Sequence, residues 1–350
     1  MTMTLDSSLS RPEGRRGRPW LRRCLIAVAL GLLAVELALG RTALTSALTH
    51  LRAPHFGWLL AALAAAVAAM GAYARMQRRL LLSAGLYVPL RRELALTYAA
   101  HSLNETLPGG AFFSTQLNYQ QMRRFGATPA VASWCIALSG ILSTAALAVV
   151  TAVGALADHG TPAWPTLAGL TAAILLITIG VRRTTRHPEK LLSLVRTALT
   201  RTNRLRRRPG DHGLEQIRAF LDQLRAARLT PGHATAAVTY ALLNWLLDAV
   251  CLWLCLRSVT DQAVTPAQLL LAFCAGMAAG TVTIVPGGLG IIDNALVLGL
   301  ITGGLDTPTA IAAVVLYRLI NLGFVIGAGW ITLGLVLRRT RHEQRHGSAG

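Results

Sequence analysis

The sequence predicts an all-α polytopic membrane protein with about six full transmembrane helices and two re-entrant helical hairpins in an inverted internal repeat. Three observations lead to this fold class. Of the 350 residues, 53% are hydrophobic and only 14% are charged, with a mean hydropathy of +0.49, which lies outside the range of soluble domains. The arginines flank apolar segments instead of forming one patch. A Pro-Gly-Gly sequence interrupts two separate apolar runs.

Apolar and basic segments divide the chain into five regions. Residues 1–23 are polar and basic without periodicity, which predicts a disordered cytoplasmic tail. Residues 24–181 form a first membrane repeat and residues 233–337 a second. Between them, residues 182–232 form a basic cytoplasmic loop, whose apolar spacing indicates an amphipathic helix on the membrane surface. Residues 338–350 form a basic cytoplasmic tail.

Six apolar runs are expected to cross the membrane: Cys24–Gly40, Gly57–Ala74, Ala130–Leu156, Trp164–Val181, Ala234–Leu256 and Ala310–Leu337. A signal peptide is the alternative for the first run, but Glu36 and the lack of a clean cleavage site favour a retained helix. The basic flanks place both termini in the cytoplasm. This requires an even number of crossings, which six spans and two hairpins satisfy.

The first Pro-Gly-Gly break is predicted to be the tip of a hairpin that enters from the cytoplasm. Its arms, Leu94–Leu107 and Ala111–Met122, are shorter than the roughly 20 residues that a spanning helix needs. Arginines precede the first arm and follow the second: Arg91, Arg92, Arg123 and Arg124. Proline removes a backbone donor and glycine tolerates positive φ, so the helix stops and restarts at Pro108-Gly109-Gly110.

The second break, Pro286-Gly287-Gly288, is predicted to be the tip of a hairpin that opens to the outside. Ala267–Val285 leads to it and Leu289–Ile301 leaves it; a full crossing is the alternative for the longer first arm. Both breaks are followed by a similar turn, Gly126-Ala127-Thr128-Pro129 and Gly304-Leu305-Asp306-Thr307-Pro308. Matched broken helices in two repeats point to a transporter binding site. Two unrelated turns between helices are the alternative.

Charges and helix ends near the breaks predict an anion site. Each restarted helix presents unpaired N–H groups and a positive dipole end, and Arg318 adds a possible bidentate phosphate contact. An ion pair of Arg318 with Asp293 or Asp248 is the alternative. Glu105 is interpreted either as a proton- or ion-coupling group or as a cap of its hairpin. For Asp248 and Asn244, an interhelical hydrogen bond is favoured. The predicted substrate-binding residues are Asn104, Glu105, Pro108, Gly109, Gly110, Gln116, Pro286, Gly287, Gly288, Gly290, Asp293, Tyr317 and Arg318.

Other function classes find no support in the sequence. The histidines and the five cysteines show no metal-ligand or disulfide spacing, and Gly287-Gly288-Leu289-Gly290 lacks the context of a nucleotide loop. No catalytic motif is present. The net charge of +19 comes from arginines beside apolar runs, which argues against nucleic acid as a partner. We therefore expect no enzyme activity, catalytic residue, metal or cofactor.

Three motifs resemble a known family. Asn104-x-x-Leu107-Pro108-Gly109, Arg124-x-Gly126, and Pro286-Gly287-Gly288-Leu289-Gly290 with the later Leu316-Tyr317-Arg318 resemble the lysylphosphatidylglycerol synthase transmembrane-region family. The resemblance runs roughly from Leu21 to Leu337 and implies a flippase-like, lipid-translocating module of the bacterial cytoplasmic membrane. The sequence departs from the family at Ser139-Gly140, where an acidic residue and an arginine are common, and at Asp293, where glutamate is common. No soluble transferase domain follows the last span, so we expect no synthase activity.

The leading hypothesis is translocation of an anionic phospholipid or a polyprenyl-linked lipid, bound through its headgroup or polyprenyl phosphate. The alternative is a non-enzymatic membrane scaffold that docks a cytoplasmic glycosyl- or aminoacyltransferase on the basic loop. An intramembrane transferase with Glu105 or Asp293 as base is the third hypothesis, and the missing motifs make it the least favoured. The sequence predicts no particular oligomeric state.

Overall fold

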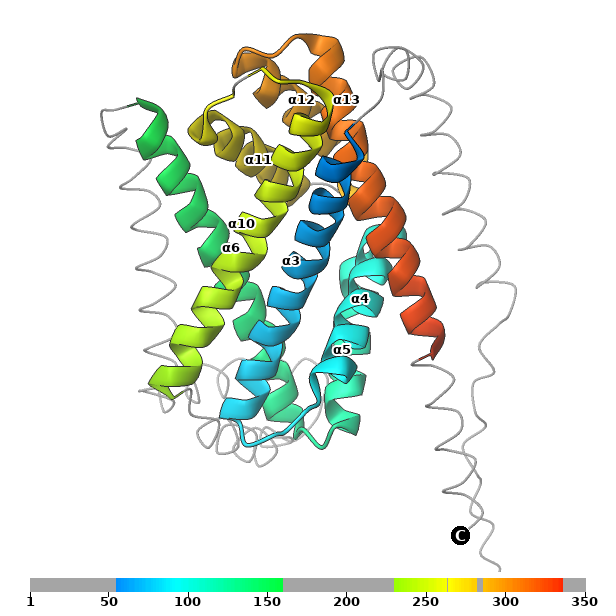
Figure 1. Cartoon of the computed structure of the whole chain (residues 1–350). Coiled ribbons are helices and arrows are strands. Elements are labelled where there is room, and N and C mark those ends of the chain that lie inside the picture. The colour runs from blue at the N-terminus through cyan, green and yellow to red at the C-terminus, as the bar shows by residue number, and fades with distance from the viewer. Residues whose placement is uncertain (1–54, 160–229, 263, 282–285, 336–350) are drawn as a thin grey trace, which may run out of the picture. The chain divides into compact units, whose positions relative to one another are not determined.

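The structure, a computed structural model, describes residues 55–159, 230–262, 264–281 and 286–335, all within one compact unit (Figure 1). These residues form helices and turns, and none of them is in a strand. The elements in chain order are α3 (Phe56–Ser83), α4 (Leu90–Thr106), α5 (Gly110–Arg124), α6 (Pro129–His159), α10 (Pro231–Val259), α11 (Pro266–Thr281), η1 (Pro286–Gly288), α12 (Ile291–Thr302), α13 (Thr307–Arg318) and the π-helix η2 (Leu319–Val325). The predicted all-α class is confirmed for this part of the chain.

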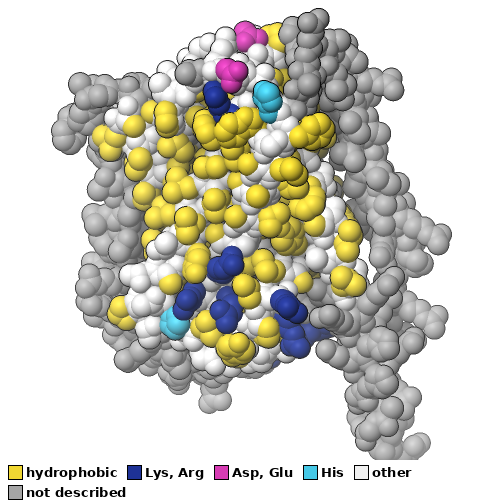
Figure 2. Space-filling view, in the orientation of Figure 1, with side chains coloured by type: hydrophobic (Ala, Val, Ile, Leu, Met, Phe, Trp, Pro, Cys, Tyr) yellow, Lys and Arg dark blue, Asp and Glu magenta, His cyan; other side chains and the backbone are white. Residues whose placement is uncertain are grey.

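Four of the described helices are long and apolar enough to span a membrane: Phe56–Ser83, Pro129–Ala157, Pro231–Val259 and Thr307–Leu335. They correspond to four of the six predicted spans, of which the last, Ala310–Leu337, was predicted to end beyond the described residues. The other two, Cys24–Gly40 and Trp164–Val181, lie outside the described residues, as do both tails and most of the basic loop. Large apolar side chains such as Leu60, Val153 and Ile331 are exposed on these helices, and Figure 2 shows a belt of hydrophobic side chains. Together these features describe a multi-pass membrane protein.

Helices α3 and α10 lie side by side along most of their length and form the most extensive helix–helix contact (Figure 1). Alanines recur at helical spacing on α3, and Ala62, Ala65 and Ala66 are buried in the same cluster as Ala249 and Cys251 of α10. Small side chains let two helix backbones approach closely. Helices α4, α6, α11 and α13 pack directly on this closely packed pair.

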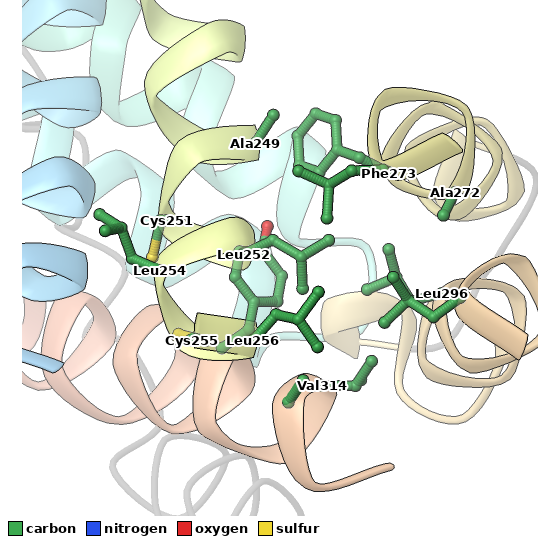
Figure 3. Packing of buried hydrophobic residues seen from close by; sticks show 14 of the residues in the cluster. Ala249, Cys251, Leu252, Leu254, Cys255, Leu256, Ala272, Phe273, Leu296 and Val314 are labelled. Carbon is green, nitrogen blue, oxygen red and sulfur yellow. The ribbon is translucent and has the colours of Figure 1, made fainter. Parts of the chain in front are cut away.

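The core on one side of α10 joins the later helices to it. Leu252 and Leu256 of α10 point toward Phe273 of α11, Leu296 of α12 and Val314 of α13 (Figure 3). All five side chains are almost fully buried. A second cluster joins α3 to the start of α6 and to α10. The helices that lead to and from both Pro-Gly-Gly turns are therefore anchored on the α3–α10 pair.

The segments around both turns form pairs of short helices. Helices α4 and α5 have 17 and 15 residues and contact each other; α11 and α12 have 16 and 12 and also pack together. All four are shorter than the roughly 20 residues of a spanning helix. The predicted arms of the first hairpin, Leu94–Leu107 and Ala111–Met122, overlap α4 and α5, although α4 begins at Leu90 and α5 extends to Arg124. In Figure 1, α4 and α5 lie in the lower half of the view and α11 and α12 in the upper half.

The contact between α4 and the helix that follows η2 depends on a glycine. Ser102 Oγ donates to the Ile326 carbonyl oxygen at 3.1 Å, and a Cβ at Gly329 would collide with Ser102 Oγ and the Tyr98 carbonyl oxygen. Overpacking of this kind costs about 1–3 kcal/mol. We therefore expect Gly329→Ala to lower the Tm of the detergent-solubilised protein. Gly327→Ala is the matched control, because a Cβ there meets nothing within 4 Å; equal shifts in the two variants would contradict the close contact.

Candidate substrate site at the Pro-Gly-Gly turns

The structure brings the two Pro-Gly-Gly turns together. Helix α4, which leads into the first turn, contacts η1, which is the second turn. A Cβ built on Gly287 would lie 3.3 Å from the Glu105 carbonyl oxygen. The two segments are far apart in the sequence, and their contact places most of the predicted substrate-binding residues in one region.

The first turn depends on two glycines. Gly109 has φ 68°, in the left-handed region, and precedes α5 as its N-cap residue. The Gly110 N–H donates to the Leu107 carbonyl oxygen at 2.8 Å, and a Cβ at Gly110 would collide with the Asn104 carbonyl oxygen. Pro108 is exposed. The chain can therefore reverse this sharply only with glycine at both positions.

Polar side chains of the first turn remain accessible. Asn104 is exposed and Glu105 is half-buried, and Asn104 Nδ2 donates to Glu105 Oε1 at 2.8 Å. Gln116 is exposed on α5. No described side chain caps the N-terminus of α5. The first turn thus offers amide and carboxylate groups to a ligand, whereas the N–H groups of Gly110 and Phe112 already donate to the Leu107 and Gly109 carbonyl oxygens.

The second turn is capped by its own helix. Gly287, Gly288 and Gly290 all have positive φ. The Gly290 N–H donates to Asp293 Oδ2 at 2.8 Å, so that the Asp293 carboxylate lies at the N-terminus of α12. The predicted anion site at this helix end is therefore occupied by a carboxylate of the protein itself.

Arg318 of α13 connects this cap to the second turn. Its Nε forms an ion pair with Asp293 Oδ1, and its Nη1 donates to the Gly287 carbonyl oxygen at 3.2 Å. Its Nη2 is buried and has no hydrogen-bond partner among the described residues. Of the two ion pairs considered for Arg318, the structure contains the one with Asp293. The guanidinium therefore keeps one nitrogen, Nη2, whose donors are unpaired in this arrangement of the described residues.

Asp248 of α10 belongs to a neighbouring hydrogen-bond cluster. Its Oδ1 accepts from the Tyr317 hydroxyl at 3.2 Å and from Asn321 Nδ2 at 3.3 Å. The interhelical hydrogen bond predicted for Asp248 is thus present, with partners on α13 and η2. Tyr317 is 3% exposed and faces Asp248, whereas its neighbour Arg318 reaches the second turn; a contact of Tyr317 with substrate stays a prediction.

The π-helix η2 begins directly after Arg318. Such wide turns occur frequently at functional sites. Asn321 of η2 donates to the Asp248 carboxylate of α10. Arg318, the residue directly before η2, pairs with the Asp293 carboxylate of α12. Among the described residues, no group of three or more His, Cys, Asp or Glu side chains is placed to bind a metal ion.

Sequence reasoning missed one buried ionisable residue, Glu93 in the first turn of α4. It is 0% exposed, although its neighbours Arg91 and Arg92 suggest a surface segment. The available signal was periodicity, since Glu93, Leu96, Thr97 and Ala100 follow helical spacing and are all buried.

One protein-family model matches most of the chain, including both turns and Arg318. The family model for the lysylphosphatidylglycerol synthase TM region matches residues 24–329. The chain belongs to this family. The match confirms the resemblance carried by the Pro-Gly-Gly motifs, and it concerns the membrane region of the family alone. No curated protein matches the chain.

Proposed function

We propose that this member of the family is a flippase-like protein that translocates an anionic lipid, either a phospholipid or a polyprenyl-linked lipid, across the cytoplasmic membrane. The observation that carries the proposal is the meeting of two glycine-broken turns beside Arg318. In hydrocarbon, broken helices persist only where protein or a water-filled cavity satisfies their backbone groups. A meeting point of two such breaks is therefore suited to a polar headgroup.

Charge distribution supports hairpins that enter from opposite sides. The exposed arginines Arg91 and Arg92 begin α4, and Arg123 and Arg124 end α5, at the ends remote from the first turn. Figure 2 shows arginines gathered at the lower end of one face, below the hydrophobic belt. Positive charge marks the cytoplasmic side. The α4–α5 pair would then be re-entrant from the cytoplasm and the α11–α12 pair from the outside, as in inverted-repeat transporters.

Exchange of partners at Arg318 provides a translocation step. A buried guanidinium stays paired, because an isolated charge in this environment is costly. A lipid phosphate that reaches the turns can replace Asp293 on Arg318, since Arg binds phosphate through parallel N–H groups. Asp293 then keeps its hydrogen bond to the Gly290 N–H at the positive end of α12. Lipid binding would thereby loosen α13 from the second turn and allow the site to open to the other side.

Reconstitution in liposomes tests this function. The purified full-length protein is reconstituted with tail-labelled fluorescent phosphatidylglycerol or phosphatidylcholine, and the fraction reduced by external dithionite is followed over time. We expect faster transfer of the anionic lipid than of the zwitterionic one, and competition by a polyprenyl phosphate. Transfer no faster than in protein-free liposomes, together with co-purification of a cytoplasmic transferase, would favour the scaffold alternative.

A further inference from the structure

Glu93 lies in a buried polar cluster away from the two turns. The residue belongs to the first turn of α4, which is not one of the four spanning helices. Both carboxylate oxygens are buried and have no hydrogen-bond partner among the described residues. An unpaired buried carboxylate is strongly disfavoured, so burial favours the protonated, uncharged form of Glu93.

The surroundings of Glu93 supply further unpartnered oxygens. Gln77 of α3 is 2% exposed and Thr97, one turn along α4, is 3% exposed. Gln77 Oε1 and Thr97 Oγ1 also have no partner in the described part of the chain. Tyr73 of α3 and Cys135 of α6 both interact electrostatically with Glu93, and Tyr73 also interacts with Gln77. Beside Glu93 the cluster thus contains only neutral polar groups, among which an uncharged, protonated carboxyl is favoured over a carboxylate.

Cations close to Glu93 do not neutralise it directly. Arg78 of α3 interacts electrostatically with Glu93, but its Nε donates to the Val88 carbonyl oxygen at 2.8 Å. Burial raises the pKa of Glu93 to about 8, against a smaller lowering by Arg78.

The other described segments packed on α4 include α5, η1, η2 and the helical residues 326–335 that follow η2, which carry no titratable side chain. Helix α5 carries Tyr119, Arg123 and Arg124, and Arg123 Nη1 donates to the Ala127 carbonyl oxygen. The segments η1 and η2 carry no titratable side chain. No charged group on these elements is therefore paired with Glu93.

We propose that Glu93, with Gln77, Thr97 and Tyr73, is a proton-binding site, and that separation of α4 from α3 during lipid transport releases this proton to water at the arginine-rich end. The coupling rests on the proposed function, whereas the proton site does not. When water reaches Glu93, its O–H bond breaks, the electron pair stays on the carboxylate, and the proton passes to water. Arg78, Arg91 and Arg92 then stabilise the carboxylate in the open arrangement.

Infrared spectroscopy of the purified full-length protein tests the proton site. At pH 7 the wild type should show the C=O stretching band of a protonated carboxyl, which disappears as the pH rises through about 8. Glu93→Gln should lack this band, Glu93→Asp should shift it, and Asp261→Asn, which changes a carboxyl that is 93% exposed, should leave it unchanged. A wild-type protein without the band, or a Glu93→Gln variant that retains it, would overturn the proposal.

A pH gradient in the liposome assay tests the coupling. With the compartment at the arginine-rich end made alkaline, wild-type transfer of phosphatidylglycerol should accelerate by up to about tenfold per pH unit for one coupled proton. Glu93→Gln should transfer lipid at a rate independent of the gradient, while Asp261→Asn responds as the wild type does.

The outcomes separate the two claims. Equal gradient responses in wild type and Glu93→Gln, or a response to a sodium gradient instead, overturn the coupling while the lipid function stands. If the wild type moves no lipid at all, the lipid function and the coupling both fall. The proton site is then tested only by the infrared band, which does not depend on lipid transport.

Discussion

Arg318→Ala should reduce lipid translocation by about one to two orders of magnitude, because a hydrogen bond from the guanidinium to the lipid phosphate contributes about 1.5–3 kcal/mol and each 1.36 kcal/mol corresponds to tenfold in rate. The change removes the only side chain that contacts both Asp293 and the Gly287 carbonyl oxygen in the described residues. It also removes the donor proposed to bind the lipid phosphate. The measurement is the initial rate of phosphatidylglycerol transfer in liposomes, normalised to folded protein.

Two further variants separate headgroup binding from structural pairing. Arg257→Ala is the matched control, because Arg257 also pairs with an aspartate, Asp261, at 3.4 Å but lies at the end of α10, far along the chain from the turns; it should transfer lipid normally. In the double variant Asp293→Asn/Arg318→Gln, both charges are removed, so no unpaired charge remains. If Arg318 binds phosphate, the double variant stays inactive although its Tm recovers. Recovery of transport in the double variant would show that Arg318 acts only as a partner of Asp293.

Single cysteines at the ends of the short helices should react from opposite sides of the membrane. In a background without the five native cysteines, we expect Arg92→Cys and Arg124→Cys to react with a membrane-impermeant reagent only from the cytoplasm. Asp261→Cys and Thr307→Cys should react only from the outside. All four positions are exposed, so the contrast should be close to complete, and it is measured by labelling intact and inverted vesicles.

The same four positions test each hairpin separately. Arg92 and Arg124 bracket α4 and α5, and a re-entrant hairpin requires both to lie on one side. Asp261 and Thr307 bracket α11, η1 and α12 in the same way. Labelling of the two members of a pair from opposite sides would mean that the segment between them crosses the membrane, and the inverted arrangement would be wrong.

Much of the helical layout was predictable because it depends on local sequence. The long apolar runs gave four described spans, and proline with glycine located both turns to the residue. Helix ends were less predictable: α4 begins at Leu90 instead of Leu94, since Pro89 provides its N-cap. Hydropathy does not register a cap of this kind, which depends on backbone geometry at a single residue.

Pairing inside the bundle was not predictable from the sequence. Asp248 and Asp293 were both plausible partners of Arg318, and the choice depends on how α10 and α12 are rotated against α13. The structure gives Arg318 to Asp293 and leaves Asp248 to Tyr317 and Asn321. The π-helix that brings Asn321 to Asp248 has no clear sequence signature. Residue composition identified the charged groups, whereas tertiary packing assigned their partners.

Helix α3 has a length that bears on how lipid reaches the protein. Its 28 residues extend about 42 Å at about 1.5 Å per residue, whereas the hydrocarbon core is about 30 Å thick. The excess carries the last turns, with Arg75, Arg78 and Arg79, into the headgroup layer. At that depth arginines attract anionic lipids by about 1 kcal/mol each. The annulus of lipid beside α4 would thus be enriched in the charged species before any molecule enters the protein, so the composition of the surrounding leaflet sets the effective substrate concentration.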